Sequence, residues 1–173
     1  MGRGPRMTEI GKPGARPRLA LAAYALALVT VVVDQASKAW ILYGLDLPTL
    51  GSVPVAGPLS LTMVWNRGVS FGLFRADQDI MRWVLTAFSL GVAVVLSVWA
   101  RRAERRLMGL GLGLVIGGAI GNAIDRARFG AVVDFVDVQR LGFFPWVFNI
   151  ADAAITIGVI MLLLDSARRD PAP

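Results

Sequence analysis

The 173-residue sequence contains no cysteine and no histidine. Without cysteine, the chain cannot form a disulfide, use a thiol nucleophile or bind a metal ion through thiolates. Without histidine, it cannot use a serine–histidine or cysteine–histidine nucleophile pair, and it lacks the commonest metal ligand. Glutamate and lysine occur only at Glu9, Glu104, Lys12 and Lys38. Acid–base chemistry must therefore come mainly from aspartate, from these few residues or from tyrosine.

Charged residues are also scarce. They make up 17% of the chain, whereas soluble domains have about 25%. The hydrophobic share is 55% and the mean hydropathy is +0.61, which indicates an integral membrane protein. The net charge of +6 comes from arginines at the ends of apolar segments. Such arginines orient a chain in a membrane, so we do not expect a nucleic-acid partner.

Four apolar segments are long enough to cross a bilayer, which requires about 20 residues. A cleaved signal peptide fits the first segment poorly, because the apolar run is too long and contains Asp34 and Lys38. We expect an all-α membrane protein with loops at residues 44–79 and 126–145 and a short strand within the first loop, at 60–66. The expected spans are residues 19–43, 80–100, 107–124 and 146–164.

Basic residues cluster before the first span, between the second and third spans, and after the fourth span. By the positive-inside rule these segments face the cytoplasm, and the two long loops lie outside. The expected organisation is a basic cytoplasmic tail at residues 1–18, a transmembrane domain at 19–165 and a second cytoplasmic tail at 166–173.

Glycines recur at every fourth position from Gly109 to Gly121 in the third span. A glycine within a helix costs about 1 kcal/mol relative to alanine in water. In a bilayer, a stripe of small residues lets two helix backbones approach closely, so we expect a tight helix–helix contact here. Asn122, Asp125 and Arg126 follow at the helix end with i, i+3, i+4 spacing, which places them on one side of the helix.

Carboxylates gather toward the outer ends of the expected spans. Two neighbouring carboxylates can share one proton, since like charges raise one pKa. Such a pair can activate a water molecule and polarise a carbonyl group, as in aspartic proteases. This is the hydrolytic mechanism that the composition supports, but the spacing alone does not choose the pair. The candidates are Asp125, Asp134, Asp137 and Asp152.

Simpler roles stay open for the same residues. Asp34 and Lys38, four residues apart, can form an internally neutralised pair, and Asp125 can pair with Arg126 at the helix end. If residues 132–138 are extended, Asp134 and Asp137 point to opposite faces, so one of them lies outside a shared site. A proton-coupled transporter is the competing function, although the chain shows no internal repeat.

Five short blocks, in this order, resemble the bacterial lipoprotein signal peptidases, also called signal peptidase II. The resemblance covers roughly residues 20–165 and includes all four spans. One small departure is Val69, where the family more often has alanine. The blocks are Asp34–Lys38, Asn66–Phe71, Gly117–Arg126, Val132–Phe135 and Phe148–Ala153.

The resemblance implies a monomeric aspartic endopeptidase of the bacterial cytoplasmic membrane that needs no cofactor or metal. Its substrates would be prolipoproteins, cut just before a cysteine that carries diacylglycerol, with membrane lipids as the other partners. Asp134 and Asp152 would be the catalytic pair, and the loop at residues 44–79 could cover the site. The implied supporting or substrate-binding residues are Asp34, Lys38, Asn66, Gly68, Asn122, Asp125, Arg126 and Asn149.

Overall fold

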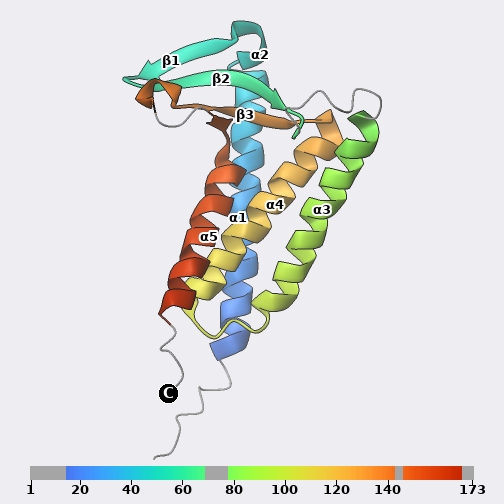
Figure 1. Cartoon of the computed structure of the whole chain (residues 1–173), viewed down its shortest axis with the longest axis vertical. Coiled ribbons are helices and arrows are strands. Elements are labelled where there is room, and N and C mark those ends of the chain that lie inside the picture. Colours follow the sequence, from blue (N-terminus) through green and yellow to red (C-terminus); the bar gives the residue numbers. More distant parts are fainter. Residues whose placement is uncertain (1–14, 69–77, 143–145, 169–173) are drawn as a thin grey trace, which may run out of the picture.

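The computed structural model describes residues 15–68, 78–142 and 146–168. Figure 1 shows a bundle of long helices with a small sheet at one end. Within these described ranges, four helices are long and apolar enough to cross a membrane, which confirms the predicted fold class. They are α1 Ala15–Ala39, α3 Gln78–Ala100, α4 Arg106–Phe129 and α5 Ile150–Ala167.

The helix ends differ from the predicted spans, and local capping explains two of these differences. Helix α4 runs five residues past the predicted end at residue 124, until Gly130 ends it in a left-handed conformation. Helix α5 begins four residues later than predicted, because Asn149 caps its first turn. Helix α1 begins at Ala15 and so takes the last residues of the predicted tail. The rest of that tail, residues 1–14, lies outside the described residues, as do 169–173.

Helix α4 lies between α1, α3 and α5 and packs against all three. Its glycines make this possible, as predicted. A Cβ atom at Gly113 would lie 2.5 Å from the carbonyl oxygen of Ala23 on α1. On another face of the helix, a Cβ atom at Gly118 would lie 2.5 Å from the carbonyl oxygen of Ala151 on α5. The bundle is therefore held by close backbone contacts around one glycine-rich helix.

A four-stranded antiparallel sheet covers one end of the bundle, with strand order β1-β2-β3-β4. The strand predicted at residues 60–66 is present as β2. The sequence prediction placed strands only between the first and second spans, but β3 and β4 come from the segment between α4 and α5. The strands are β1 Ser52–Ala56, β2 Leu59–Asn66, β3 Val132–Asp137 and β4 Val147–Phe148.

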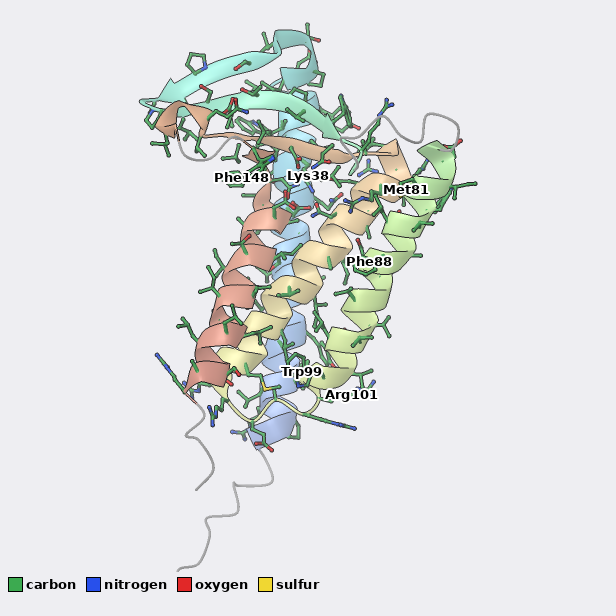
Figure 2. All side chains as sticks on the ribbon, in the orientation of Figure 1. Lys38, Met81, Phe88, Trp99, Arg101 and Phe148 are labelled. Carbon is green, nitrogen blue, oxygen red and sulfur yellow. The ribbon has the colours of Figure 1, made fainter. Side chains whose placement is uncertain are left out.

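A second apolar cluster joins the sheet to the helices. Ile41 lies in the π-helical turn η1 Trp40–Gly44 that continues α1, and Leu47 begins the short helix α2 Leu47–Leu50. Both pack with Val133 and Phe135 of β3. This cluster fixes β3 directly above the ends of α1 and α4 (Figure 1). Figure 2 shows Lys38 and Phe148 at this end of the molecule and Trp99 and Arg101 at the other.

Candidate active site

Asp134 lies on β3 and is 1% exposed. Its Oδ2 accepts a hydrogen bond from Nδ2 of Asn66 at 2.9 Å, and its Oδ1 accepts one from Nδ2 of Asn149 at 2.7 Å. Burial raises the pKa of Asp134 to about 6, and the charge of Asp152 adds to this rise, while the two amides and Lys38 oppose it. The Asp134 carboxyl group can therefore bind and release a proton near neutral pH.

Asp152 lies in the first turn of α5 and is half-buried. Its Oδ1 accepts a hydrogen bond from Nδ2 of Asn122 on α4 at 2.8 Å. Its Oδ2 accepts one from the backbone N–H of Asn149 at 3.4 Å, and the Asn149 side chain accepts one from the Asp152 N–H at 3.0 Å. This reciprocal capping box fixes the carboxylate at the positive end of the helix.

Asn149 connects the two aspartates. It is completely buried, its side-chain amide donates to Asp134, and its backbone N–H donates to Asp152. The same amide group also donates to Oδ1 of Asn122 at 3.3 Å. One buried residue thus holds one carboxyl group from a strand and one from a helix. The charge of Asp152 raises the pKa of Asp134, so the two carboxyl groups interact, and two interacting carboxyl groups can hold one proton between them, as in aspartic proteases.

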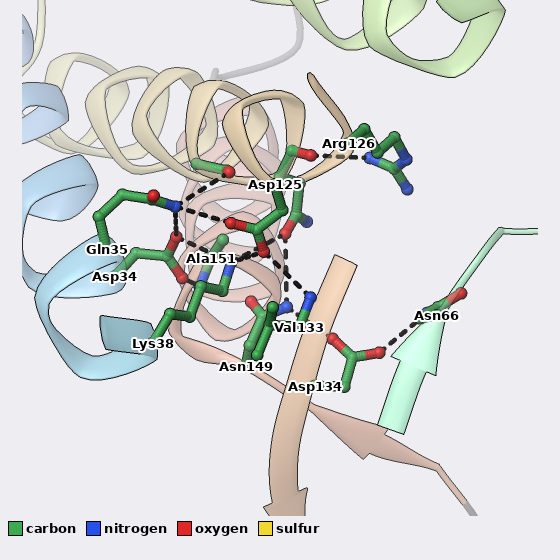
Figure 3. Close-up of polar contacts among 12 residues, drawn as sticks. Asp34, Gln35, Lys38, Asn66, Asp125, Arg126, Val133, Asp134, Asn149 and Ala151 are labelled. Carbon is green, nitrogen blue, oxygen red and sulfur yellow. Dashed lines mark hydrogen bonds and ion pairs between the residues drawn. The ribbon is translucent and has the colours of Figure 1, made fainter. Parts of the chain in front are cut away.

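A second polar cluster lies beneath this pair, between α1 and α4 (Figure 3). Lys38 Nζ lies 2.9 Å from Oδ2 of Asp34 and 2.7 Å from Oδ2 of Asp125. The lysine is 2% exposed and both carboxylates are 0% exposed. The predicted Asp34–Lys38 pair is therefore present. Adjacency in the sequence suggested Arg126 as a possible partner of Asp125. In the structure, Asp125 is paired with Lys38 instead. It continues the glycine stripe that faces α1, and Arg126 is turned about 100° away on the helix.

Arg126 lies near the site, from the last turns of α4. Its Nη1 donates to the backbone oxygen of Asn122 at 3.4 Å, and its Nε is buried with no hydrogen-bond partner within the described residues. Gly68 lies close by, since a Cβ atom there would be 3.9 Å from Nη2 of Arg126. Gly68 has a left-handed φ of 86°, and its N–H donates to Oδ1 of Asn66 at 2.9 Å. This corner therefore carries several donor groups next to Asp134.

The structure separates Asp137 from the site. Its carboxylate accepts hydrogen bonds from the Thr62 hydroxyl at 2.8 Å and from the Gln139 N–H at 2.9 Å. The prediction that one aspartate of residues 132–138 faces away is therefore confirmed. The remainder of the predicted turn at Asn66–Phe71, residues 69–71, lies outside the described residues.

Two contributors to the site were missed by the sequence reasoning. Gln35 donates to Oδ1 of Asp125 at 2.9 Å and to Oδ2 of Asp34 at 3.1 Å. Its position inside the Asp34–Lys38 block was the available signal. Arg82 of α3 donates to the backbone oxygens of Arg126 and Ala127 at the end of α4, at 2.7 and 2.5 Å.

Within the described ranges, no three acidic side chains gather in a way that could hold a metal ion.

The chain is similar to known proteins over most of its length. The family model described as signal peptidase (SPase) II matches residues 26–168. A lipoprotein signal peptidase of Caulobacter vibrioides is 58% identical over 83% of this chain and 85% of that protein. One from Methylorubrum extorquens is 51% identical over 84% of each.

Two solved structures described as bacterial membrane enzymes have the same fold. They match with TM-scores of 0.70 and 0.72, each at 27% identity. The first match covers 88% of this chain and 93% of that one, and the second covers 87% and 94%. Because the family model matches residues 26–168, relatives more than half identical carry the family's name, and four of the described helices are long and apolar enough to cross a membrane, the chain belongs to the signal peptidase II family of membrane proteases.

Proposed function

We propose that Asp134 and Asp152 are the catalytic pair with which this membrane peptidase removes signal peptides from prolipoproteins. Membership of the family makes the chain a prolipoprotein-processing enzyme and supersedes the transporter interpretation. The observation that carries the choice of residues is the bridging of Asp134 and Asp152 by Asn149, through its side chain to one and its backbone to the other. Asp125 makes no such contact, because it is bound to Lys38 and Gln35.

The environments of the two carboxyl groups suggest different roles for them. The Asp152 carboxylate accepts hydrogen bonds from the Asn149 N–H at the start of α5 and from the Asn122 side chain. Asp134 has a pKa raised to about 6 by burial, so it is the better holder of the shared proton. In the proposed reaction the oxygen of a water molecule attacks the scissile carbonyl carbon while Asp152 accepts a proton from that water. Asp134 donates its proton to the carbonyl oxygen.

The second half of the reaction reverses these proton positions. The tetrahedral intermediate collapses, the carbon–nitrogen bond breaks, and Asp152 gives its proton to the leaving amine. The carbonyl group reforms and returns a proton to Asp134, so the pair ends in its starting state. The reaction uses only water and the two carboxyl groups. All residues named in it belong to a single chain, and we propose that the enzyme acts as a monomer.

The arrangement of charge supports an outward-facing site. Arg101 lies at the end of the bundle opposite the sheet (Figure 2), and the connection from α3 to the start of α4 also carries Arg102, Arg105 and Arg106. By the positive-inside rule that end is cytoplasmic, as both termini would be, and the aspartates lie toward the outer leaflet. A substrate whose cysteine carries diacylglycerol is anchored in the membrane near this depth. We therefore propose cleavage just before that cysteine, within the domain formed by residues 19–165.

The residues around the pair have the chemistry to hold an extended substrate. Asn66 and Arg126 present side-chain donors beside Asp134, and Gly68 adds backbone without a side chain. We propose that they bind substrate carbonyl groups and that the segment 44–79 covers the bound peptide. Deletion of residues 67–70 should then abolish cleavage, and unchanged cleavage would refute the covering role.

The assignment of the pair is tested with purified wild type, Asp134→Asn, Asp152→Asn and the control Asp137→Asn. Cleavage of a diacylglyceryl-modified prolipoprotein is measured in detergent, with thermal stability alongside. Each variant of the pair should lose at least about 100-fold in kcat, the usual contribution of an acid–base group. Asp137→Asn should stay within about threefold of wild type, since Asp137 faces away from the site. A folded variant of the pair that still cleaves at the wild-type rate would refute the assignment.

A further inference from the structure

Each aspartate of the proposed pair is preceded in the chain by a residue whose backbone N–H is bound by a buried carboxylate. The N–H of Val133, next to Asp134, donates to Oδ2 of Asp125 at 3.1 Å. The N–H of Ala151, next to Asp152, donates to Oδ1 of Asp34 at 2.9 Å. The N–H groups of a first helical turn have no partner within the helix, so the Ala151 group depends on Asp34.

Lys38 holds these two carboxylates together. Its ammonium group contacts Asp34 at 2.9 Å and Asp125 at 2.7 Å, and the whole cluster is almost completely buried. Gln35 donates to both carboxylates as well. Among the described residues, none of these four side chains forms a hydrogen bond or ion pair with the carboxyl groups of Asp134 or Asp152 themselves. Their links to the pair run through the backbone of the preceding residues and through Asn122.

We propose that Lys38, Asp34 and Asp125 are positioning residues that set the separation of the two catalytic carboxyl groups. We call this group the backbone clamp. The inference rests on the proposed roles of Asp134 and Asp152. Asp125 fixes the strand that carries Asp134, and Asp34 fixes the helix turn that carries Asp152. Lys38 joins the two carboxylates. Hydrogen bonds to charged acceptors are about twice as strong as neutral ones, which suits carboxylates to this task.

The fold leaves room for the clamp at the crossing of α1, α4 and α5. A Cβ atom at Gly121 would lie 2.6 Å from Oδ2 of Asp34, so only glycine accommodates the carboxylate there. The position of the two catalytic carboxyl groups must be accurate, because a displacement of about 1 Å in an active site can lower the rate about 100-fold. A purely structural ion pair would hold helices together without any need to contact the two backbone groups beside the catalytic residues.

The first test compares Lys38→Met, Asp34→Asn and Asp125→Asn with the control Asp165→Asn. Asp165 is also a buried carboxylate with a basic partner in a spanning helix, but at the opposite end of the bundle. The clamp variants should lose at least about 30-fold in kcat with KM changed by less than about threefold. Asp165→Asn should keep kcat within about twofold. Equal effects on kcat in the two sets, at matched loss of thermal stability, would overturn the proposal.

A second test removes single backbone hydrogen bonds without changing any side chain, and it remains decisive if Lys38→Met does not fold. Lactic acid at position 151, or hydroxyisovaleric acid at 133, replaces the N–H by an ester oxygen. Each should lower kcat by about 10-fold. Lactic acid at position 153 is the control, since that N–H bonds within the helix to the Asn149 oxygen at 3.1 Å. Equal loss of kcat at positions 151 and 153 would overturn the proposed positioning of Asp152 through the hydrogen bond from the Ala151 N–H to Asp34.

Failure of this inference can be told apart from failure of the proposed function. If Asp134→Asn or Asp152→Asn still cleaves, the catalytic assignment is wrong, whatever the clamp variants do. If both are inactive while the clamp variants and the esters retain wild-type kcat, the catalytic pair stands and the clamp is refuted.

Discussion

The two ends of the helix bundle both contain a buried aspartate paired with a basic residue, but the pairs are built differently. At the sheet end, Lys38 is 2% exposed and contacts two carboxylates at 2.9 and 2.7 Å. At the other end, Arg105 is 48% exposed and lies 4.0 Å from Asp165. The first pair lies in a network with several hydrogen bonds, whereas the second joins the residue before α4 to the end of α5.

The space around each pair differs in the same way. Arg105 and Asp165 line a cavity of about 220 Å³ together with Trp99, Arg102, Glu104 and Met108. At the sheet end, Gly121 is packed against Asp34 so closely that no Cβ atom fits. Exposed ion pairs contribute at most about 1 kcal/mol to stability, while loss of one partner from a buried pair leaves an uncompensated charge. The same type of ion pair therefore positions the catalytic carboxyl groups at one end of the bundle, and contributes only a little to stability at the other.

Two glycines of the same stripe test whether the two ends of the bundle differ in their tolerance of an added methyl group. Gly121→Ala places a methyl group 2.6 Å from the Asp34 carboxylate, whereas Gly109→Ala meets the Leu19 carbonyl oxygen at 3.4 Å, an ordinary contact. We expect Gly121→Ala to lower kcat by more than about 10-fold through displacement of the clamp. Gly109→Ala should stay within about twofold. The measurement is prolipoprotein cleavage with thermal stability in parallel, and equal activity of the two variants would show that the ends tolerate change alike.

Asparagine substitutions compare the two ends by their effect on stability. Asp134 has its pKa raised from 3.8 to about 6 in the folded protein. The folded state therefore binds more protons than the unfolded state between these values, and stability falls as pH rises from about 4 to about 6. Asp134→Asn removes this cost, which is at most about 3 kcal/mol, less one hydrogen bond, because an amide cannot accept from both Asn66 and Asn149.

We expect Asp134→Asn to melt at a higher temperature than wild type at pH 7 and to lose that advantage below about pH 4. Asp165→Asn, at the other end, should not gain stability at pH 7, since it weakens the pairing with Arg105. Melting curves from pH 4 to pH 8 measure both effects. A pH-independent difference between Asp134→Asn and wild type would contradict the raised pKa of Asp134.

Removal of a single hydrogen bond to Asp134 gives a smaller, directional effect. Asn66 donates to Oδ2 of Asp134 at 2.9 Å and lowers its pKa against the larger effect of burial. Asn66→Leu should therefore raise that pKa, and the fall of kcat/KM on the alkaline side should move to higher pH. Asp165→Asn is again the control and should leave the profile unchanged. A profile that stays in place or moves to lower pH in Asn66→Leu would mean that Asp134 is not the proton holder.

The parts of the molecule that sequence could predict are those with a pattern in one dimension. The four spans follow from apolar length, and a close helix–helix contact along α4 follows from glycines spaced by one turn, although the identity of its partner, α1, does not. Asp34 and Lys38 are neighbours on a single helix, so their pairing could also be predicted. In each case the contacting groups lie within one helix or on a repeated face.

The parts that could not be predicted depend on contacts between distant segments. Strand β3 joins β2 although Asp134 and Asn66 are 68 positions apart, and no local pattern sets that register. The carboxylate bonds to Val133 and Ala151 involve backbone N–H groups, which every residue except proline possesses. The pairing of Asp125 with Lys38 was not predicted. The adjacency of Asp125 and Arg126 in the sequence does not reveal which helix packs against α4 at Asp125.

The smallest expected effect is at Arg105, the exposed partner of the ion pair at the end of the bundle opposite the sheet. Arg105→Gln removes an ion pair of 4.0 Å in which the arginine is 48% exposed, together with a 3.3 Å hydrogen bond to the Asp165 carbonyl oxygen. We expect a loss of less than about 1 kcal/mol in stability and kcat within about twofold of wild type. Lys38→Met, the matched change at the sheet end, should lose far more of both. If Arg105→Gln instead lowers kcat as strongly as Lys38→Met, then accuracy at the catalytic pair depends on the whole bundle, and burial at one end does not explain it.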